Sequence, residues 1–417
     1  MGEPRLPAIR NGEDKYYIYG VYPLNEAQPM EASERNTYDV IVLGVGSMGA
    51  ATCYHLARRG VRVLGLEQFD LPNQLSSHNG QTRIIRKAYG ESPEYVPILQ
   101  RAYENWQTLE RETGSRVYYQ TGLVYFGLPG SPFLQTVLES SARFGIPLRR
   151  LEAGERARRF PQFRLPEGFL MLEEPEAGFL VPERCIELLA EQAKRHGAEI
   201  HTREAVLEWQ RREAGITVTT NRGSYRARKL VVAAGPWAGK LLPSLAGSLQ
   251  VTRQALAWVR PEKEEDFGLG RFPCWMYEEN GKCYYGFPML PEGEAGPAAG
   301  LKLALHHPGE PVGDPALANR ETTPADTRPL TSFLRKFLPG GQGEIRSVKI
   351  CLYTNTPDAD FILDFLPGQG KDVVVGCGFS GHGFKFASAV GEVLADLATQ
   401  GQTDLPIAFL GLDRLAE

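Results

Sequence analysis

The chain has 417 residues, which is long enough for two domains and a large apolar core. Its 46 basic and 50 acidic residues give a formal net charge of −4, so charge alone indicates neither a nucleic acid nor an anionic membrane as a partner. The six cysteines form no C-x-x-C pair and no apolar run approaches the length of a membrane span, which argues against a zinc site, a disulfide framework and a membrane-spanning helix.

The first 37 residues mix charged residues, proline and tyrosine. They contain no continuous apolar stretch of the kind that forms the centre of a signal peptide. We therefore predict that residues 1–37 are an N-terminal extension of a protein that lies in the reducing cytoplasm.

The first predicted elements are typical of dinucleotide-binding proteins. Residues 38–43 form an apolar, β-branched run that predicts a buried strand, and residues 50–59 have helical spacing. Between them lies the motif Gly44-Val45-Gly46-Ser47-Met48-Gly49. A second apolar run, residues 61–66, predicts another strand that ends at the acidic Glu67. Strand, glycine turn, helix, strand and acidic residue within about thirty residues predict a bound cofactor that contains ADP.

Each glycine of this motif has its own physical role. Gly44 permits the tight turn, Gly46 lets the backbone approach a pyrophosphate, and Gly49 lets the helix pack closely on the strand. The helix N-terminus offers N–H groups to the anion, and Glu67 is placed to accept hydrogen bonds from a ribose hydroxyl. The predicted contacts with this half of the cofactor are Gly44, Gly46, Ser47, Met48, Gly49, Glu67 and Gln68.

Further elements follow in chain order. Helical spacing covers residues 94–113 and, beginning at Pro182, residues 182–196. Near the end, a buried strand at residues 373–378 leads through a Gly-rich turn into a helix over residues 384–397. Short strands are predicted at residues 117–126, 168–180, 199–202, 206–211, 216–220, 225–228, 230–237, 255–260, 283–287 and 301–306, with a Pro- and Gly-rich loop at residues 290–300.

NAD and FAD share the first motif, so the choice between them depends on the C-terminal turn. The turn from Gly378 to Gly383 joins a buried strand to a helix, whose N-terminus would point toward the cofactor. A reduced flavin carries negative charge along its N1–C2=O edge, which the positive end of a helix dipole stabilises. A nicotinamide needs no such charge. The turn therefore favours a flavin, although a flexible loop is the simpler interpretation of the same residues.

Elements suited to nucleotide binding thus occur at both ends and in the middle of the chain. We predict an α/β (α+β) fold with a discontinuous, Rossmann-like FAD-binding domain of the glutathione-reductase type, formed by residues 38–119, 185–254 and 359–417. Residues 120–184 and 255–358 are predicted to form a substrate domain on a mixed or antiparallel sheet.

Five segments resemble the monomeric sarcosine oxidase family, which includes N-methyltryptophan oxidase and pipecolate oxidase. They occur in family order and at similar spacing, and the resemblance runs from Tyr38 to the C-terminal region. It implies a flavoprotein that oxidises a secondary amino acid to an imine, with oxygen as the electron acceptor and hydrogen peroxide as the product. The segments are Ser77 to Arg86, Tyr284 to Pro288, Gly300 to Leu303, Cys351 to Thr356 and Gly378 to Lys385.

For the cofactor, the resemblance implies a covalent bond between the sulfur of Cys351 and the 8α-methyl carbon of FAD. It places Lys302 over the flavin ring near N5, where a cation stabilises the superoxide formed as oxygen is reduced, and Arg83 against the flavin. From the residues alone, Cys351 is typical of an inert apolar side chain and Lys302 of a solvated strand face. The other implied cofactor contacts are Gly378, Ser380, Gly381, His382, Gly383 and Lys385.

For the substrate, the resemblance brings Arg86 and Lys385 together around the carboxylate, which an arginine fork binds bidentately. As isolated residues, both are typical surface charges. His306 is implied to line the substrate cavity. The other side chains implied around the substrate are Tyr353, Tyr285, Met276 and Phe287, the last two of which are also credible as ordinary core residues.

One residue departs from the family. Asn79 precedes Gly80 at a position where family members carry a histidine beside the flavin. The sequence leaves open whether the neighbouring His78 replaces that histidine.

The sequence thus predicts a monomeric FAD-dependent oxidase of sarcosine, another N-methyl amino acid or L-pipecolate, with the small amino acid and O2 as its partners. Two alternatives remain: a dehydrogenase that passes electrons to a protein acceptor, and a flavin-binding subunit without turnover. Arg86 and Lys385 argue against the latter, because a purely structural subunit needs no substrate-binding charges. The residues predicted to be catalytic are Lys302, His306, Arg83 and Tyr353.

Overall fold

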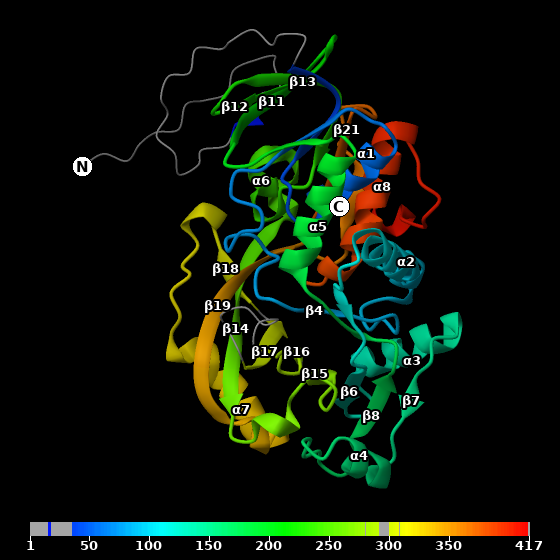
Figure 1. Cartoon of the computed structure of the whole chain (residues 1–417), viewed down its shortest axis with the longest axis vertical. Coiled ribbons are helices and arrows are strands. Elements are labelled where there is room, and N and C mark those ends of the chain that lie inside the picture. Colours follow the sequence, from blue (N-terminus) through cyan, green and yellow to red (C-terminus); the bar gives the residue numbers. More distant parts are fainter. Residues whose placement is uncertain (1–15, 18–35, 280, 292–299, 308, 416–417) are drawn as a thin grey trace, which may run out of the picture.

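The computed structural model describes residues 16–17, 36–279, 281–291, 300–307 and 309–415. Most of the predicted N-terminal extension and of the predicted loop at 290–300 lies outside the described residues. The described chain forms two large sheets and one small sheet, with helices packed around them (Figure 1).

The first large sheet contains the predicted nucleotide-binding strands, in the order β1-β11-β12-β13-β2-β3-β10. Strand β2 (Thr37–Leu43) pairs in parallel with β3 (Val63–Leu66) on one side and with β13 (Ser224–Val232) on the other. Strand β13 also pairs in parallel with β21 (Val373–Cys377). Strands from both ends and the middle of the chain are therefore neighbours in one sheet. The remaining strands are β1 (Tyr16–Tyr17), β10 (Glu199–His201), β11 (Val206–Arg212), β12 (Gly215–Thr220) and β20 (Ile362–Phe365).

Helix α1 (Ser47–Arg58) packs against this sheet and against both α5 (Pro182–Arg195) and α8 (Ala387–Gln400). Because it is surrounded on these sides, α1 is buried continuously from Met48 to Ala57. It begins at Ser47 rather than within the predicted range 50–59, since the last residues of the glycine motif already form its first turn.

Strand β13 differs from the prediction. Residues 225–228 and 230–237 were expected to form two strands, but one strand runs from Ser224 to Val232 and a 3-10 turn follows at Gly235–Trp237. The first half of β13 pairs with β12 and alternates between buried and exposed residues. The second half lies between β2 and β21 and is buried on both faces. One strand thus carries the two sequence patterns of an exposed and a fully buried sheet.

The second large sheet has the order β18-β14-β17-β16-β15-β6-β8-β7, with β19 paired to β14. Its long strands β14 (Gln250–Pro261) and β19 (Gly343–Asn355) lie side by side in antiparallel pairing (Figure 1). All its pairs are antiparallel except that of β6 with β15, so the sheet is mixed and the predicted fold class is confirmed. The other strands are β6 (Leu123–Gly127), β7 (Arg149–Arg150), β8 (Leu170–Glu174), β15 (Cys274–Glu279), β16 (Lys282–Gly286), β17 (Leu301–His307) and β18 (Glu310–Val312).

The remaining strands form the small sheet, in which β9 (Gly178–Leu180) pairs with β4 (Arg83–Ile85) and β5 (Tyr118–Tyr119). The predicted division into domains stays a prediction; its boundary at residues 254/255 falls inside β14 and that at 184/185 inside α5. The remaining helices are α2 (Val96–Thr113), α3 (Pro132–Phe144), α4 (Ala153–Arg159), α6 (Ala238–Leu241) and α7 (Pro324–Phe337), of which the sequence analysis predicted α2 alone.

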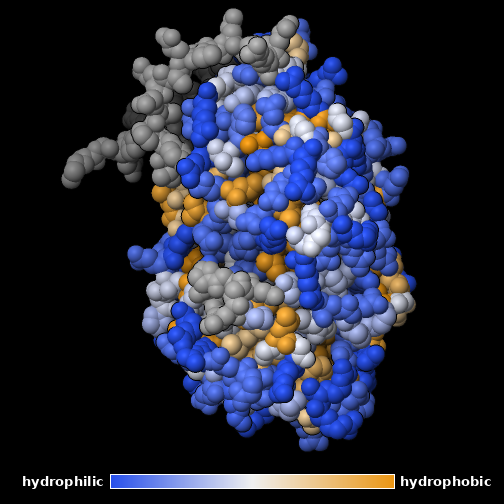
Figure 2. Space-filling model, viewed as in Figure 1, coloured by the Kyte–Doolittle hydropathy of each residue, from blue (hydrophilic) through white to orange (hydrophobic). Residues whose placement is uncertain are grey.

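The molecular surface is mainly polar on the face seen in Figure 2, where small apolar groups lie between hydrophilic residues. Within the described ranges, no helix combines the length and the apolar character needed to cross a membrane.

The close packing of α8 on α1 depends on Gly391. A Cβ atom at Gly391 would lie 2.4 Å from the Cβ atom of Ala51 and 2.5 Å from its carbonyl carbon. Overpacking of this kind costs about 1–3 kcal/mol, so we predict that Gly391→Ala lowers the free energy of unfolding by that amount in urea denaturation. Gly130→Ala is the matched control, because a Cβ atom there has no heavy atom within 4 Å. An equal loss in both variants would contradict the prediction.

Candidate active site

The glycine turn after β2 has the geometry that its sequence suggests. Gly44 has φ of +86°, and a Cβ atom there would lie 2.7 Å from the carbonyl oxygen of Ala233. A Cβ atom on Gly49, in the first turn of α1, would lie 1.8 Å from the carbonyl oxygen of Gly44. Only a glycine at this position therefore lets α1 lie so close to the turn. At Gly46 the nearest atom is Nδ1 of His78 at 3.8 Å, and this position faces open space. The turn therefore leaves room for a ligand at Gly46.

Glu67 closes this turn from the end of β3. Its Oε2 accepts a hydrogen bond from the backbone N–H of Val45 at 3.0 Å, and its Oε1 accepts one from the N–H of Phe69 at 3.0 Å. Burial raises the pKa of Glu67 to about 7, against the effect of these backbone donors. The side chain is thus fixed at the mouth of the turn, where a ribose of a dinucleotide would lie.

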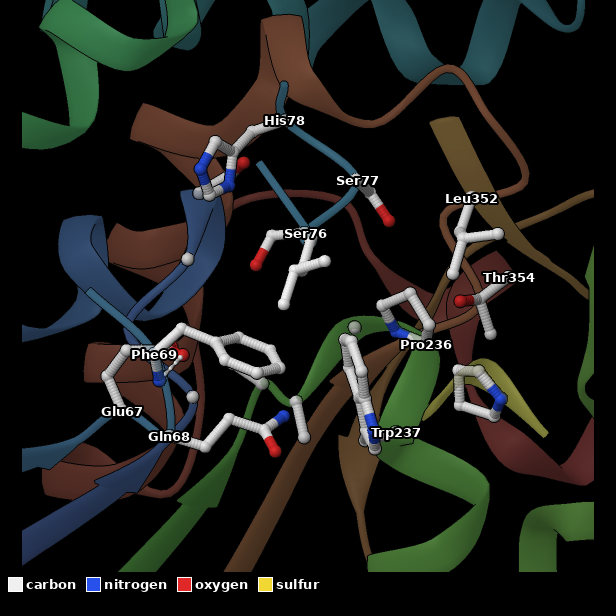
Figure 3. Close-up of a pocket in the computed structure, with 18 of the residues that line it drawn as sticks. Glu67, Gln68, Phe69, Ser76, Ser77, His78, Pro236, Trp237, Leu352 and Thr354 are labelled. Carbon is white, nitrogen blue, oxygen red and sulfur yellow. Dashed lines mark hydrogen bonds between the residues drawn. The ribbon is translucent and has the colours of Figure 1, made fainter. Parts of the chain in front are cut away.

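A cavity of about 950 Å³ extends from this turn toward β19. Its walls come from the glycine turn, the residues after β3, the loop at residues 75–78, the end of β13, β19 and the turn at residues 378–384. Figure 3 shows Glu67 and Phe69 on one side of the cavity, with Trp237 and Leu352 across from them. The cavity therefore joins segments that are far apart in the sequence.

The cavity separates the predicted residues into two groups. The lining includes Gly44, Gly46, Ser47, Met48, Glu67, Gln68, Gly378, Gly381, Gly383, Arg83 and Tyr353. The lining does not include Gly49, Cys351, Ser380, His382, Lys385, Lys302, His306, Arg86, Tyr285, Met276 and Phe287, which lie behind it or beside it.

Several lining residues were not predicted. Ser76, Ser77, Trp237 and Arg320 belong to the wall. Trp237 follows a Gly-Pro turn at the end of a buried strand, and that pattern could have predicted a residue at the cavity. Nothing in the sequence distinguishes Arg320 from other surface arginines. Arg320 donates hydrogen bonds to the carbonyl oxygens of Leu75 at 2.7 Å and Ile350 at 3.3 Å, and so ties the loop to β19.

The turn before α8 lines the cavity and packs closely against Tyr353. Ser380 has φ of +45° and Gly381 has φ of +79°. A Cβ atom on Gly381 would lie 2.2 Å from Cε2 of Tyr353, so only glycine fits against this tyrosine. The chain then continues through a 3-10 turn (Phe384–Phe386) into α8. Phe384 in this turn lines the cavity, and α8 begins at Ala387 rather than at the predicted residue 384; an N-terminus that points toward the cofactor stays a prediction.

Cys351 lies directly behind the cavity wall on β19. Its side chain is buried, and Sγ donates to the carbonyl oxygen of Ser77 at 3.2 Å. Nη2 of Arg83 lies 3.6 Å from the same sulfur and also donates to the carbonyl oxygens of Ser77 and Asn79, at 2.9 and 2.6 Å. The structure thus brings Cys351 and Arg83 together at the cavity.

Lys302 is a buried cationic side chain on β17. Its Nζ donates to the carbonyl oxygens of Gly80 at 2.6 Å and Thr82 at 2.7 Å, and lies 3.0 Å from Oγ1 of Thr82. Nζ also lies 4.5 Å from the ring centre of Phe287 and 5.6 Å from that of Trp258. Burial, reinforced by Arg83, holds the pKa of Lys302 well below its usual value. Three oxygens and two aromatic faces are nevertheless the surroundings that suit an ammonium group.

His306 and Tyr353 form a hydrogen-bonded pair beside the cavity, with 3.2 Å between Nδ1 and the hydroxyl oxygen. The register between β16 and β17 shifts next to Cys283, and the rings of His306 and His307 lie on the same side with centres 3.9 Å apart. A β-bulge has this effect of redirecting side chains. Burial holds the pKa of His306 well below its usual value, so its imidazole is neutral. The ring of Tyr285 lies 6.0 Å from that of His306.

Arg86 is buried and already has an anionic partner. Its Nη2 bonds both carboxylate oxygens of Glu91, at 2.7 and 2.5 Å. Burial alone would raise the pKa of Glu91, but Arg86, with His382 and Lys385, holds it at about 2. This carboxylate was not predicted from the sequence. Lys385 lies near the pair, and burial, together with Arg86, lowers its pKa to about 7.

Asn79 and His78 have different surroundings in the structure. Nδ2 of Asn79 donates to the carbonyl oxygens of Gln74 at 3.0 Å and Ser76 at 2.9 Å, so the amide stabilises its own loop. His78 instead lines the cavity (Figure 3), and its buried Nε2 has no hydrogen-bond partner among the described residues. His78 thus places one unpartnered, buried ring nitrogen beside the cavity, one residue before the family position.

Comparisons with known proteins agree with this geometry. A family described as FAD dependent oxidoreductase matches residues 39–397. The chain belongs to this family. The chain is 39% identical to monomeric sarcosine oxidase of Bacillus sp. (strain NS-129) over 90% of this chain and 97% of that one, and 35% identical to N-methyl-L-tryptophan oxidase of Yersinia pestis (strain Pestoides F) over 90% and 99%. The resemblance to the monomeric sarcosine oxidases is therefore confirmed.

Solved structures show the same fold. An amino acid oxidase described as essential for nikkomycin biosynthesis has a TM-score of 0.79 and 26% identity over 90% of this chain and 97% of that one. L-proline dehydrogenase from P. horikoshii has a TM-score of 0.78 at 23% identity over 91% and 98%, which shows the fold alone. The protein is thus an FAD-dependent oxidoreductase. The glycine turn, the fixed Glu67 and the unpartnered nitrogen of His78 fit this cofactor.

Proposed function

We propose that the protein oxidises the C–N bond of a secondary amino acid, namely sarcosine, another N-methyl amino acid or L-pipecolate, to an imine and reduces O2 to hydrogen peroxide. The observation that carries the proposal is the pair of buried cations, Arg86 and Lys385, next to the polar pair of His306 and Tyr353. Relatives named sarcosine oxidase and N-methyl-L-tryptophan oxidase support the same substrate class. We also expect the protein to act as a monomer.

When bound, FAD would supply the redox chemistry, which is the transfer of two electrons from the substrate to oxygen. Residues around the glycine turn and Glu67 would hold the ADP half, and Arg83, Tyr353 and the turn before α8 would surround the flavin half. The positive end of α8 would stabilise negative charge on that half.

We further propose that Cys351 attaches the flavin covalently. The sulfur is buried beside cavity-lining Leu352, and Arg83 lies 3.6 Å from it, so a cation is in place for the thiolate that such chemistry requires.

We predict that wild-type protein keeps its flavin after acid precipitation, whereas Cys351→Ala releases it. The measurement is absorbance of the supernatant at the flavin band. Cys377→Ala, which changes another buried cysteine in β21, is the control and should retain its flavin. Complete release of flavin from the wild type would contradict covalent attachment.

Lys302 is proposed to assist the reaction with oxygen. Reduction of O2 passes through superoxide, and a fixed positive charge in a water-poor site stabilises that anion. The backbone oxygens of Gly80 and Thr82 hold Nζ in one place, so the charge needs no rearrangement when oxygen arrives.

We expect Lys302→Met to slow reoxidation of the reduced flavin by about three powers of ten or more, equivalent to several kcal/mol of lost stabilisation. Anaerobic reduction by substrate should change much less, as measured by stopped-flow absorbance. Lys349→Met is a matched control, because Lys349 contacts the ring of the same Trp258 at 5.9 Å from a more exposed position. Equal losses in both half-reactions would remove Lys302 from this role.

Arg86 would bind the substrate carboxylate. In the described structure Nη2 of Arg86 already holds both carboxylate oxygens of Glu91, so an incoming carboxylate must share or replace these hydrogen bonds. Glu91 has 25% of its side chain exposed while Arg86 has 1%, which makes Glu91 the partner that can move toward solvent. Lys385 adds a second charge. Its pKa is about 7, so a small rise in this pKa when the carboxylate binds keeps the ammonium group protonated at neutral pH.

We predict that Arg86→Ala raises the Michaelis constant for an N-methyl or cyclic amino acid at least tenfold, because ~1.4 kcal/mol of lost binding already gives that factor. Amines without a carboxylate should be poor substrates for the wild type in a peroxide assay. Arg143→Ala, which breaks an exposed Arg–Glu pair with Glu94, is the control and should leave the constant unchanged. Equal turnover of decarboxylated analogues would favour a general amine oxidase instead.

A further inference from the structure

The ring of Tyr89 lies within cation–π distance of both cations of the proposed carboxylate site. Tyr89 is fully buried in the segment that connects β4 to α2. The guanidinium carbon of Arg86 is 4.4 Å from the centre of its ring, and Nζ of Lys385 is 5.2 Å from the same centre. The negative face of an aromatic ring attracts cations, most strongly where water is excluded. One ring therefore supports both charges, which would otherwise repel each other across a buried site.

The orientation of this ring is fixed by His382. The hydroxyl of Tyr89 lies 2.5 Å from Nδ1 of His382, whose Nε2 lies 3.0 Å from the carbonyl oxygen of Ala359. A carbonyl oxygen only accepts, so Nε2 carries the proton and Nδ1 accepts from the tyrosine hydroxyl. Burial lowers the pKa of His382 to about 4, which keeps this arrangement neutral and unchanged around pH 7.

His382 also controls the second cation through its backbone. Its carbonyl oxygen accepts a hydrogen bond from Nζ of Lys385 at 2.6 Å. The imidazole itself packs against Phe361, with ring centres 4.6 Å apart. One residue thus holds the tyrosine ring with its side chain and the lysine with its main chain.

We propose that Tyr89 and His382 are positioning residues that set the spacing of Arg86 and Lys385 for the substrate carboxylate. This inference rests on the proposed function and extends it. Glu91 pairs with Arg86 but is partly exposed, whereas the ring of Tyr89 is buried and stays in place when the anion changes. The Tyr89–His382 pair is thus the permanent part of the carboxylate site, and it makes the site specific for substrates that carry an anionic group at this point.

The experiment compares variants of the flavin-loaded protein with sarcosine as substrate and acetate as a probe of the carboxylate site. Acetate binding is followed by the change in flavin absorbance. Tyr89→Leu, which removes the ring, should raise both the Michaelis constant for sarcosine and the dissociation constant for acetate at least tenfold, with less than a threefold change in kcat. Tyr89→Phe keeps the ring and loses the bond to His382, so it should give a smaller increase in both constants.

Tyr95→Leu is the matched control. Tyr95 belongs to the same aromatic cluster, with its ring 5.4 Å from Tyr89 and 5.7 Å from His382, but in the described part of the chain it contacts neither cation. A purely structural role for the cluster would make Tyr95→Leu and Tyr89→Leu alike, with lower flavin content or kcat and unchanged acetate binding, and that result would overturn the inference.

The same measurements separate this inference from the proposed function. If Arg86→Ala weakens acetate binding while Tyr89→Leu and Tyr89→Phe do not, the positioning role is wrong and the carboxylate site remains. If acetate does not bind the wild type and Arg86→Ala has no effect, the carboxylate site itself is wrong. Should Tyr89→Leu fail to fold, Tyr89→Phe decides, because unchanged constants in that variant contradict the role of the bond to His382.

Discussion

The site depends on one constraint, which is the position of the loop between β3 and β4. Cationic side chains donate hydrogen bonds to the backbone carbonyl oxygens of this loop and hold it beside the second large sheet. Lys302 from β17 binds the carbonyl oxygens of Gly80 and Thr82, and Arg83 binds those of Ser77 and Asn79. A buried backbone carbonyl without a partner is costly, so these cations stabilise the loop, with Arg83 lining the cavity and Lys302 beside it. Loop, cofactor cavity and the proposed oxygen site are consequently parts of one hydrogen-bonded unit.

Charge is balanced differently at the two ends of the cavity. At the nucleotide end, two backbone N–H groups donate to the carboxylate of Glu67, as suits a neutral sugar and a diphosphate. At the other end the buried cations Arg86 and Lys385 lie near one partly exposed carboxylate, Glu91, and the half-buried Arg83 lines the cavity. Such an excess of positive charge has a desolvation cost that an anionic ligand offsets. This asymmetry is the physical reason to expect an amino acid carboxylate and a reduced flavin at that end.

The sequence predicted those features that depend on local chain geometry. The turn at Gly44 and Gly49 followed from motif and spacing, because each glycine acts on its immediate neighbours. The partners of buried charges could not be predicted in this way. Glu91 reaches Arg86 only through the course of the segment between β4 and α2, and Arg320 reaches the cavity only because β14 and β19 bring its loop there. Helix α7 was missed although the Thr323–Asp326 capping box and Pro324 marked its start.

The central claim is that a secondary amino acid reduces the flavin and oxygen reoxidises it within the same site. Anaerobic stopped-flow mixing with sarcosine and with L-pipecolate, followed by a second mix with O2, tests it directly. The account predicts rapid loss of the oxidised flavin absorbance with at least one of these substrates, then rapid recovery with one hydrogen peroxide formed per flavin. Flavin that stays oxidised with every secondary amino acid, or reduced flavin that oxygen reoxidises only slowly, would contradict it.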